Sequence, residues 1–394
     1  MAQEPRRTIF FVVIASTALG PMSAHILLPS IPGLAQVFDS DFATVQLTLT
    51  LYLAVLALAQ LVYGPVSDRI GRRPALLAGL GLYLVGSLVC VLAPTIEVLI
   101  GGRIVQALGG CAGMVIGRAI VRDLYERERA ASMIAYVISA MVLVPMLSPS
   151  VGGFLDVWFG WSAVFQFLFV VGAAVLGATA WLLPETHLEL SKGSGFLSMA
   201  GSYAKVLGQR AFLGYSFNVA FSMGVWMCFV GGAPYVTIEL QGISPSEFGI
   251  YFIGVSALFA AGNFTAGRVS ERVGSNRMIV LGTWITIACT ALLGFYALSG
   301  KLDTFNLFWP VMVMSFGQGL SLPNAMAGAV SVDPHRIGAA SGLTGFMQMS
   351  AAAACTYLMG ILLVDTAIPM VVAMMVLSVL AYAAIVLGSW PWRR

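Results

Sequence analysis

Long apolar stretches follow one another along almost the whole 394-residue chain, separated by short polar segments. A helix needs about 20 apolar residues to cross the hydrocarbon core of a bilayer, and most of these stretches reach that length. Only 9% of the residues are charged, against about 25% in soluble domains. The composition excludes a soluble enzyme and a disordered chain. It predicts twelve transmembrane helices, at residues 8–28, 45–63, 74–92, 96–120, 131–155, 161–183, 211–236, 248–267, 278–298, 305–330, 337–363 and 368–387.

The basic residues support this order of spans and orient it. Cytoplasmic loops of membrane proteins are rich in Lys and Arg. With both termini in the cytoplasm, 18 of the 20 basic residues fall in cytoplasmic segments, only Lys301 lies outside, and Arg103 falls within a span. We therefore expect a multi-pass membrane protein with six helices in residues 1–183, a cytoplasmic linker at 184–210 and six helices in 211–394.

A short motif occurs twice along the chain. The first copy is Gly64-Pro-Val-Ser-Asp-Arg-Ile-Gly71 and the second is Gly267-Arg-Val-Ser-Glu-Arg-Val-Gly274. Each copy follows the second span of its half, so a duplicated six-helix unit is the simplest interpretation. The sequence thus predicts an all-α membrane fold of two pseudo-symmetric bundles. Parallel repeats of this kind are typical of transporters whose substrate site lies between the halves.

Several motifs together resemble one transporter family. The first copy, continued to Pro74, resembles the signature motif of the major facilitator superfamily. Arg103-Ile-Val-Gln106-Ala-Leu-Gly109 resembles its arginine motif in helix four, and Pro149-Ser-Val-Gly152-Gly153 resembles the end of the helix-five motif of its antiporters. Leu28-Pro-Ser-Ile-Pro32 and Leu183-Pro-Glu-Thr186 resemble the Bcr/CflA drug-resistance branch. The resemblance covers essentially the whole chain. It implies antibiotic or multidrug efflux of small amphipathic compounds across a bacterial inner membrane, by alternating access in exchange for protons.

The resemblance also implies a conformational gate at the signature motif. The family's matching aspartate, here Asp68, faces the N-terminus of helix eleven, near residues 338–341. The matching Arg72 pairs with an acid at the end of helix four, for which Asp123 is the candidate. We expect Gly64 and Gly71 to permit a tight turn. The second copy has Ser275 in place of Arg72, so we expect a weaker gate there. The gate residues of both copies are Gly64, Asp68, Arg69, Gly71, Arg72, Arg73, Asp123, Glu271 and Arg272.

The fifth span carries prolines and paired glycines. Pro145 and Pro149 each remove a backbone donor and bend a helix. Gly152 and Gly153 permit close packing of neighbouring helices. Two interpretations remain open at this point: a generic kinked membrane helix, or the hinge that the family associates with export by antiport.

Arg103 is the one basic residue placed well inside a span, since Arg118 lies only two residues from the cytoplasmic end of the same span. An arginine at the centre of a membrane helix costs about 2.5–3.5 kcal/mol on insertion scales, so such a residue normally faces a watery cavity or a partner. Gln106 lies one turn away on much the same face. The functional interpretation is a cavity residue that serves coupling or substrate binding. The alternative is a side chain that reaches the outer surface.

All 17 acidic residues fall in loops or at helix ends. A proton-driven exporter needs a titratable group in its pathway. The resembling branch commonly has an acid three positions before the Leu-Pro of helix one, and here that position is His25, which can serve as a proton site. Three interpretations follow: His25 replaces the acid, a peripheral acid such as Asp39 or Asp41 serves instead, or transport is not coupled to protons. A neutral, hydrogen-bonded histidine without a coupling role is the structural alternative.

The remaining candidates suggest a mainly apolar and aromatic pathway with scattered amides. Without carboxylates it suits lipophilic neutral or weakly anionic compounds better than multivalent cations. The expected pathway residues are His25, Tyr52, Arg103, Gln106, Asn218, Trp226, Gln318, Asn324 and Gln348.

Other functions fit the sequence less well. Uptake of a small metabolite is the main alternative, because the expected acid is missing. An intramembrane enzyme would need converging nucleophile and base side chains within the spans. The net charge of +3 provides no nucleic-acid surface. The five cysteines lie in apolar stretches without metal-ligand spacing. We therefore expect no catalytic residues, metal or cofactor, and a monomer whose partners are a small-molecule substrate, protons and the lipid bilayer.

Overall fold

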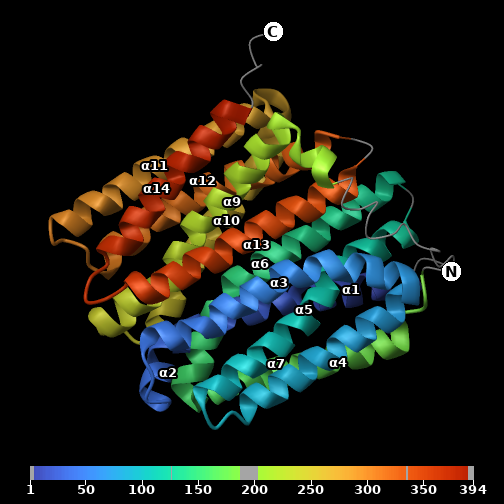
Figure 1. Ribbon diagram of the computed structural model, residues 1–394, viewed down its shortest axis with the longest axis horizontal. Helices are drawn as coiled ribbons and strands as arrows, with labels where there is room; N and C mark the ends of the chain where they lie inside the picture. The colour runs from blue at the N-terminus through green and yellow to red at the C-terminus, as the bar shows by residue number, and fades with distance from the viewer. Residues whose placement is uncertain (1–3, 126, 187–202, 334–335, 389–394) are drawn as a thin grey trace. The chain divides into compact units, whose positions relative to one another are not determined.

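The computed structural model describes residues 4–125, 127–186, 203–333 and 336–388. All regular structure in these ranges is helical: twelve long helices are joined by short helical segments and turns, and Figure 1 shows their arrangement. The chain forms two compact units, Met1–Gly193 and Ser194–Arg394. A helix satisfies its backbone hydrogen bonds internally, which is what a chain of apolar spans requires in lipid.

The first unit contains six long helices and a short helical connection. The connection after α1 is formed by η1 and α2, and Asp41 caps the next long helix by accepting a hydrogen bond from Thr44 N at 3.3 Å. The elements of the unit are α1 (Glu4–Ile26), η1 (Leu28–Ser30), α2 (Ile31–Val37), α3 (Phe42–Ile70), α4 (Arg72–Val91), α5 (Ile96–Leu124), α6 (Arg127–Phe159) and α7 (Ser162–Leu182).

Small residues allow α4 and α5 to pack backbone against backbone. A Cβ atom at Gly109 would lie 2.2 Å from Tyr83 N, and one at Gly86 would lie 2.3 Å from Gln106 N. No side chain fits at either position, so two glycines set the approach of these helices. α5 also packs against α1 and α3, which places it at the centre of the unit.

The second unit has the same number of long helices. Its central helix α9 packs against α12, α13 and α14. Four fully buried phenylalanines, Phe229, Phe248, Phe252 and Phe308, join α9, α10 and α12 through ring contacts of 5.4–6.0 Å between centroids. The elements are α9 (Arg210–Pro234), η2 (Tyr235–Leu240), α10 (Pro245–Val273), α11 (Ser275–Leu298), α12 (Thr304–Ser331), α13 (Ile337–Leu362) and α14 (Ile368–Gly388).

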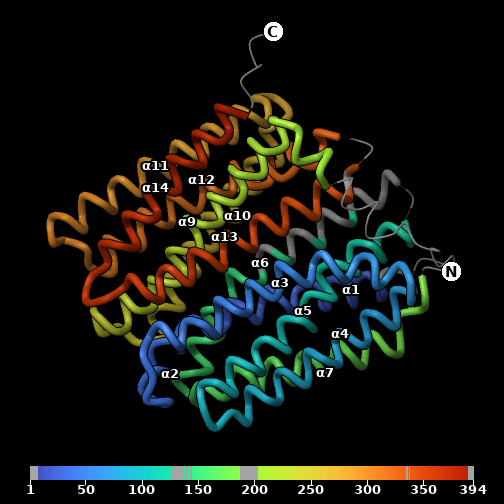
Figure 2. Tube along the Cα trace, in the orientation of Figure 1, coloured from blue at the N-terminus to red at the C-terminus, as the bar shows by residue number. Residues whose placement is uncertain are grey.

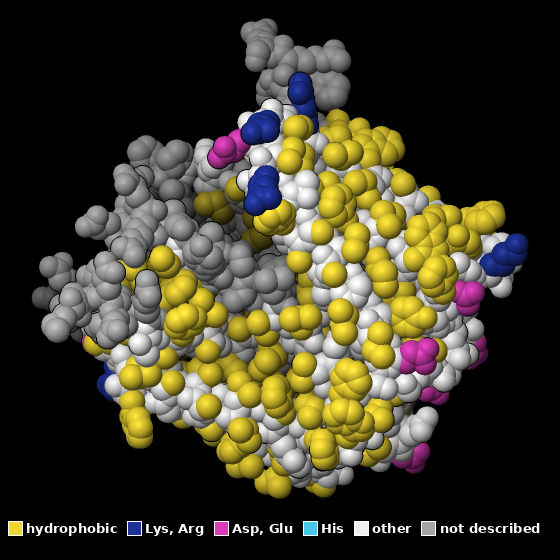
Figure 3. Space-filling model, turned by 180° about the vertical axis from the view of Figure 1, so that it is seen from behind, with side chains coloured by type: hydrophobic (Ala, Val, Ile, Leu, Met, Phe, Trp, Pro, Cys, Tyr) yellow, Lys and Arg dark blue, Asp and Glu magenta, His cyan; other side chains and the backbone are white. Residues whose placement is uncertain are grey.

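Much of the described surface is apolar. Hydrophobic side chains are spread over the described part of the face seen in Figure 3, and few charged side chains are visible there. Trp181 is 92% exposed and Phe11 68% exposed, which is unfavourable in water and favourable against lipid. Within the described ranges, ten helices are long and apolar enough to cross a membrane. α6 and α12 reach 33 and 28 residues, so the predicted twelve-helix fold is confirmed.

The segment between the second and third predicted spans, residues 64–73, is helical except at one residue. α3 continues through it to Ile70, and the chain reverses direction into α4 after Gly71 alone (Figure 2). Gly71 has a φ of 97°, a conformation that favours glycine. Gly64 lies inside α3 with open space around its Cβ position, so the expectation that it permits a turn is wrong. The second copy repeats this arrangement, with Gly274 at a φ of 96°.

Candidate functional site

The beginning of α4 is held by a carboxylate from a distant segment. Glu185, which follows α7, accepts hydrogen bonds from Arg72 N at 3.0 Å and from Arg73 N at 3.2 Å. The first amides of a helix have no partner within the helix and carry a partial positive charge, so a carboxylate there is favourable. A Cβ atom at Gly71 would lie 2.5 Å from Glu185 Oε2. Two separate constraints therefore require glycine at position 71: its positive φ, and the lack of space for a side chain beside Glu185.

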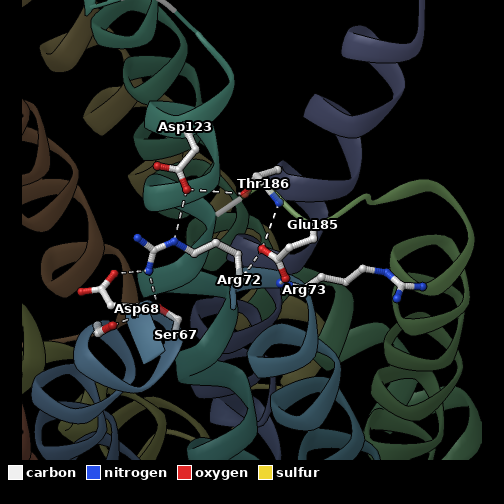
Figure 4. A network of polar contacts seen from close by, with 8 residues as sticks. Ser67, Asp68, Arg72, Arg73, Asp123, Glu185 and Thr186 are labelled. Atoms are coloured by element: carbon white, nitrogen blue, oxygen red, sulfur yellow. Dashed lines mark hydrogen bonds and ion pairs between the residues drawn. The ribbon is translucent and has the colours of Figure 1, made fainter. Parts of the chain in front are cut away.

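Arg72 connects the ends of three helices. Its Nη1 lies 2.5 Å from Asp68 Oδ1 and donates to Ser67 Oγ at 2.6 Å, both at the end of α3. Its Nε donates to Asp123 Oδ2 at 3.2 Å, at the end of α5 (Figure 4). The Arg72 side chain is 9% exposed and Asp123 20% exposed, so their ion pair is partly shielded from water, whereas Asp68 is 44% exposed and its pair with Arg72 is open to solvent on one side. The resemblance implied the pairing of Arg72 with Asp123, and the structure contains it.

The segment after α7 completes this cluster, which we call the Arg72 network: Ser67, Asp68, Arg72, Arg73, Asp123, Glu185 and Thr186 (Figure 4). Thr186 Oγ1 donates to Asp123 Oδ2 at 3.5 Å, and Arg73 Nη2 donates to Ala180 O at 2.7 Å. The sequence analysis noted Leu183-Pro-Glu-Thr186 only as a mark of the family branch. The available signal was an acidic residue just beyond the end of a helix, but its partners lie 112 and 113 residues away.

The second copy of the motif has no such network. Glu271 and Arg272 are exposed and form no ion pair with another described residue, and Arg69 of the first copy is likewise exposed. The second unit instead pairs Arg336 with Asp333, and Gln209 donates to the same carboxylate at 3.3 Å. These three residues tie the end of α12 to the starts of α13 and α9. The sequence analysis did not identify them.

A second polar cluster lies inside the first unit around Arg103, whose residue is 1% exposed. Arg103 Nη1 donates to Gln106 Oε1 at 2.6 Å, and Nε donates to the carbonyl of Thr48 at 3.3 Å. The guanidinium carbon stands 4.0 Å from the centroid of the Tyr52 ring and 6.0 Å from that of Phe165. Arg103 is therefore buried among α3, α5 and α7 and does not reach the surface in this structure.

Further hydrogen bonds fix the groups that surround Arg103. Gln106 Nε2 donates to Ser87 Oγ at 2.8 Å, and Tyr52 Oη donates to Gly20 O at 2.9 Å. Ser23 and Tyr83 share a hydrogen bond of 2.6 Å between α1 and α4. The sequence analysis selected Arg103, Gln106 and Tyr52 and missed the others. Serines and threonines are common in membrane helices, so only the three-dimensional contacts distinguish these.

His25 is buried near the end of α1. Its Nδ1 lies 3.0 Å from the carbonyl oxygen of Pro21. A carbonyl only accepts hydrogen bonds, so Nδ1 carries a proton and Nε2 is the ring atom that remains for protonation. Unlike the buried His25, the two peripheral acids Asp39 and Asp41 are exposed to solvent. The Asp41 carboxylate caps the N-terminus of α3.

The prolines and glycines of the fifth span lie in one continuous helix, α6. Pro145, Pro149, Gly152 and Gly153 are all buried. A Cβ atom at Gly152 would lie 1.8 Å from the carbonyl oxygen of Ile26, so α6 and α1 touch through their backbones here. This contact accounts for glycine at position 152 and leaves the hinge role as a prediction.

The candidate residues of the second unit occupy separate positions. Asn218 donates to Ala381 O at 2.8 Å and joins α9 to α14, and Gln318 donates to Ser222 O at 3.2 Å and joins α12 to α9. Asn324 donates to Leu320 O within α12. Trp226 packs at the edge of the phenylalanine core, 5.8 Å from Phe229. Gln348 is buried on α13. The structure does not gather these five side chains into one cluster.

Two units of six membrane-length helices, with charged networks at helix ends and a buried arginine inside one unit, define a multi-pass membrane transporter. The model of the Major Facilitator Superfamily matches residues 13–356. The chain belongs to this superfamily.

Relatives and solved structures agree with this assignment. The chain is 29% identical to a bicyclomycin resistance protein homolog of Haemophilus influenzae, over 97% of each chain. It is 31% identical to a chloramphenicol resistance protein of Pseudomonas aeruginosa, over 86% of this chain and 77% of that protein. It shares its fold with the xylose transporter XylE from E. coli in a partially occluded inward open conformation. That comparison gives a TM-score of 0.77 and 12% identity, over 98% of this chain and 97% of XylE.

Proposed function

We propose that this transporter exports small amphipathic compounds, antibiotics among them, from bacterial cells by alternating access and in exchange for protons. The Arg72 network is the observation that carries this proposal. It buries an arginine against two carboxylates at the ends of α3 and α5, next to a helix start that a third carboxylate holds. Two relatives named for resistance to antibiotics support drug compounds as the cargo.

The network acts as the gate of the first unit. Contacts that exist in one conformation and not in the other bias a two-state equilibrium by their own free energy. A movement of α4 relative to both α3 and α5 would break both ion pairs, because Asp68 lies on α3 and Asp123 on α5. The loss would be larger for the partly buried pair with Asp123 than for the pair with the more exposed Asp68. The second copy of the motif, in which Glu271 is exposed and forms no ion pair with another described residue, contributes little to the gate.

His25 is the proposed proton carrier. It is a buried titratable group of α1, and its Nε2 is the atom that accepts the proton. The exposed positions of Asp39 and Asp41 favour His25 over either acid, because the proton-relay residues of transporters normally face the interior of the helix bundle.

The distribution of basic residues gives the orientation in the membrane. Eighteen of the 20 Lys and Arg residues lie on the same side of the predicted spans, and that side is the cytoplasmic one. Both termini are therefore cytoplasmic, in the bacterial inner membrane. The polar network thereby lies at the cytoplasmic surface. The proposed transporter is a monomer.

The test is drug accumulation in cells that lack their own exporters. Expression of the chain should lower accumulation of chloramphenicol, and a protonophore should restore it. Rising accumulation on expression would instead indicate the alternative, uptake. In liposomes, His25→Gln should abolish substrate-induced proton release, whereas Asp39→Asn and Asp41→Asn should retain it. Normal release by His25→Gln would remove His25 from the mechanism.

A further inference from the structure

We propose that the guanidinium of Arg103 is the binding site for the anionic group of a lipophilic monoanion, so that aromatic or aliphatic weak acids are among the exported compounds. This inference rests on the proposed function, because it names a substrate class for the same transporter. The site lies wholly within the first unit.

The first argument is charge. Arginine stays protonated in proteins, and a buried charge is costly unless it is paired. Arg103 forms no ion pair with any residue that the structure describes. The 17 acidic residues of the sequence all lie in loops or at helix ends, so the spans supply no internal counter-ion. A bound ligand with one negative charge would provide the missing charge.

The second argument is an unused donor. Arg103 Nε donates to Thr48 O and Nη1 donates to Gln106 Oε1, but Nη2 is buried and has no hydrogen-bond partner. Buried polar groups in native proteins are almost always hydrogen-bonded, so such an atom requires an explanation. Nη2 carries two N–H groups, and a carboxylate or phenolate oxygen is the acceptor that guanidinium binds most strongly.

The third argument is that the guanidinium is held in place before any ligand binds. Gln106 is itself fixed by Ser87, and the Tyr52 ring lies against the guanidinium face at 4.0 Å. Tyr52 is fixed in turn by its hydrogen bond to Gly20 O. A preorganised donor loses little freedom on binding.

The surroundings select a lipophilic acid over an inorganic anion. The rings of Tyr52 and Phe165 lie next to the charge, Val164 and Leu168 are on the same helix as Phe165, and all four side chains are fully buried. An apolar ligand in contact with these side chains would gain free energy by leaving water, whereas a chloride ion would lose its hydration and gain only the interaction with one charge.

The experiment compares three ligands of one shape with the purified full-length protein. The probes are 9-anthracenecarboxylate, the neutral 9-anthracenecarboxamide and the cationic 9-(aminomethyl)anthracene, titrated by fluorescence in gluconate buffer. We expect the carboxylate to bind about tenfold more tightly than the amide, with the cation weakest. Equal binding of the three, or preference for the cation, would overturn the proposal without any variant.

Variants then locate the preference. Arg103→Gln should bring carboxylate affinity down to that of the amide, and Arg103→Lys should keep part of the preference because it keeps the charge. Arg118→Gln is the matched control, since Arg118 lies on the same helix with its Nε bonded to Met114 O. A carboxylate preference that survives Arg103→Gln, or that Arg118→Gln removes, would contradict the assignment.

Two further readouts separate the possible failures. Exchange of gluconate for chloride should leave carboxylate binding unchanged, and competition by chloride would make this an inorganic-anion site instead. Cells that export chloramphenicol while the purified protein shows no carboxylate preference would refute this inference and leave the proposed function standing. The reverse result would refute export and leave the anion site standing.

Discussion

Replacement of Glu185 by glutamine tests the role of the segment after α7 in the gate. Glu185 uses both carboxylate oxygens on the start of α4, one on Arg72 N at 3.0 Å and one on Arg73 N at 3.2 Å. Glutamine keeps one acceptor oxygen and loses the charge. A charge at a helix N-terminus contributes about 0.3–1 kcal/mol, and about 2 kcal/mol when partly buried.

The loss should therefore be about 1 kcal/mol, and such a change alters an equilibrium constant roughly fivefold. If the bond holds the gate in one conformation, Glu185→Gln should slow efflux by about that factor and leave ligand affinity unchanged. The assay is initial efflux rate from loaded cells at matched expression, together with ligand binding by the purified protein.

The control is Glu239→Gln, which removes the same charge from an exposed side chain of η2. It should behave as wild type. Efflux by Glu185→Gln at the wild-type rate would refute the reasoning, and so would an equal effect of the control. Slower efflux with a parallel loss of ligand affinity would mean that the carboxylate shapes the substrate site and not the gate.

Three further substitutions test the packing and the ion pairs. Gly71→Ala should lower the melting temperature and the efflux rate, because its backbone conformation, φ 97° and ψ 156°, costs alanine about 1–3 kcal/mol; Gly64→Ala, inside α3 with open space around it, should change neither, and a matching loss there would contradict the structure. Asp123→Asn removes the charge that Arg72 faces on α5 and leaves Arg72 with an ion pair to α3 alone. The variant should slow efflux, and stopped-flow assays can measure the rate. An unchanged rate would mean that this ion pair is not part of the gate. Gly109→Val should prevent stable folding, because its Cβ would lie 2.2 Å from the α4 backbone; a normal yield by size-exclusion chromatography would contradict that contact.

The fold was predictable from the sequence because apolar length alone determines how many helices cross the membrane. Helix ends were less predictable: α3 runs through Gly64 to Ile70, since the charged motif is helical beyond the apolar stretch. Charge alternation between loops says nothing about where a helix stops. Of the two glycines from which a turn was expected, Gly71 has the backbone conformation that the motif suggested and Gly64 does not.

The candidate site was predictable in part. Arg72 and Asp123 came from the family resemblance, and Arg103 stood out as a charge within a span. Thr48 could not be found from the sequence, because its contribution is a backbone carbonyl, which every residue has. Glu185 could not be assigned a role because its hydrogen bonds span more than a hundred residues.

The most direct test of the central claim uses purified protein in liposomes with an imposed proton gradient. We expect labelled chloramphenicol to accumulate against its own gradient in the compartment from which protons leave, and to stop doing so when a protonophore collapses the gradient. Movement that only equalises the drug concentration, with or without the protonophore, would contradict proton-driven export.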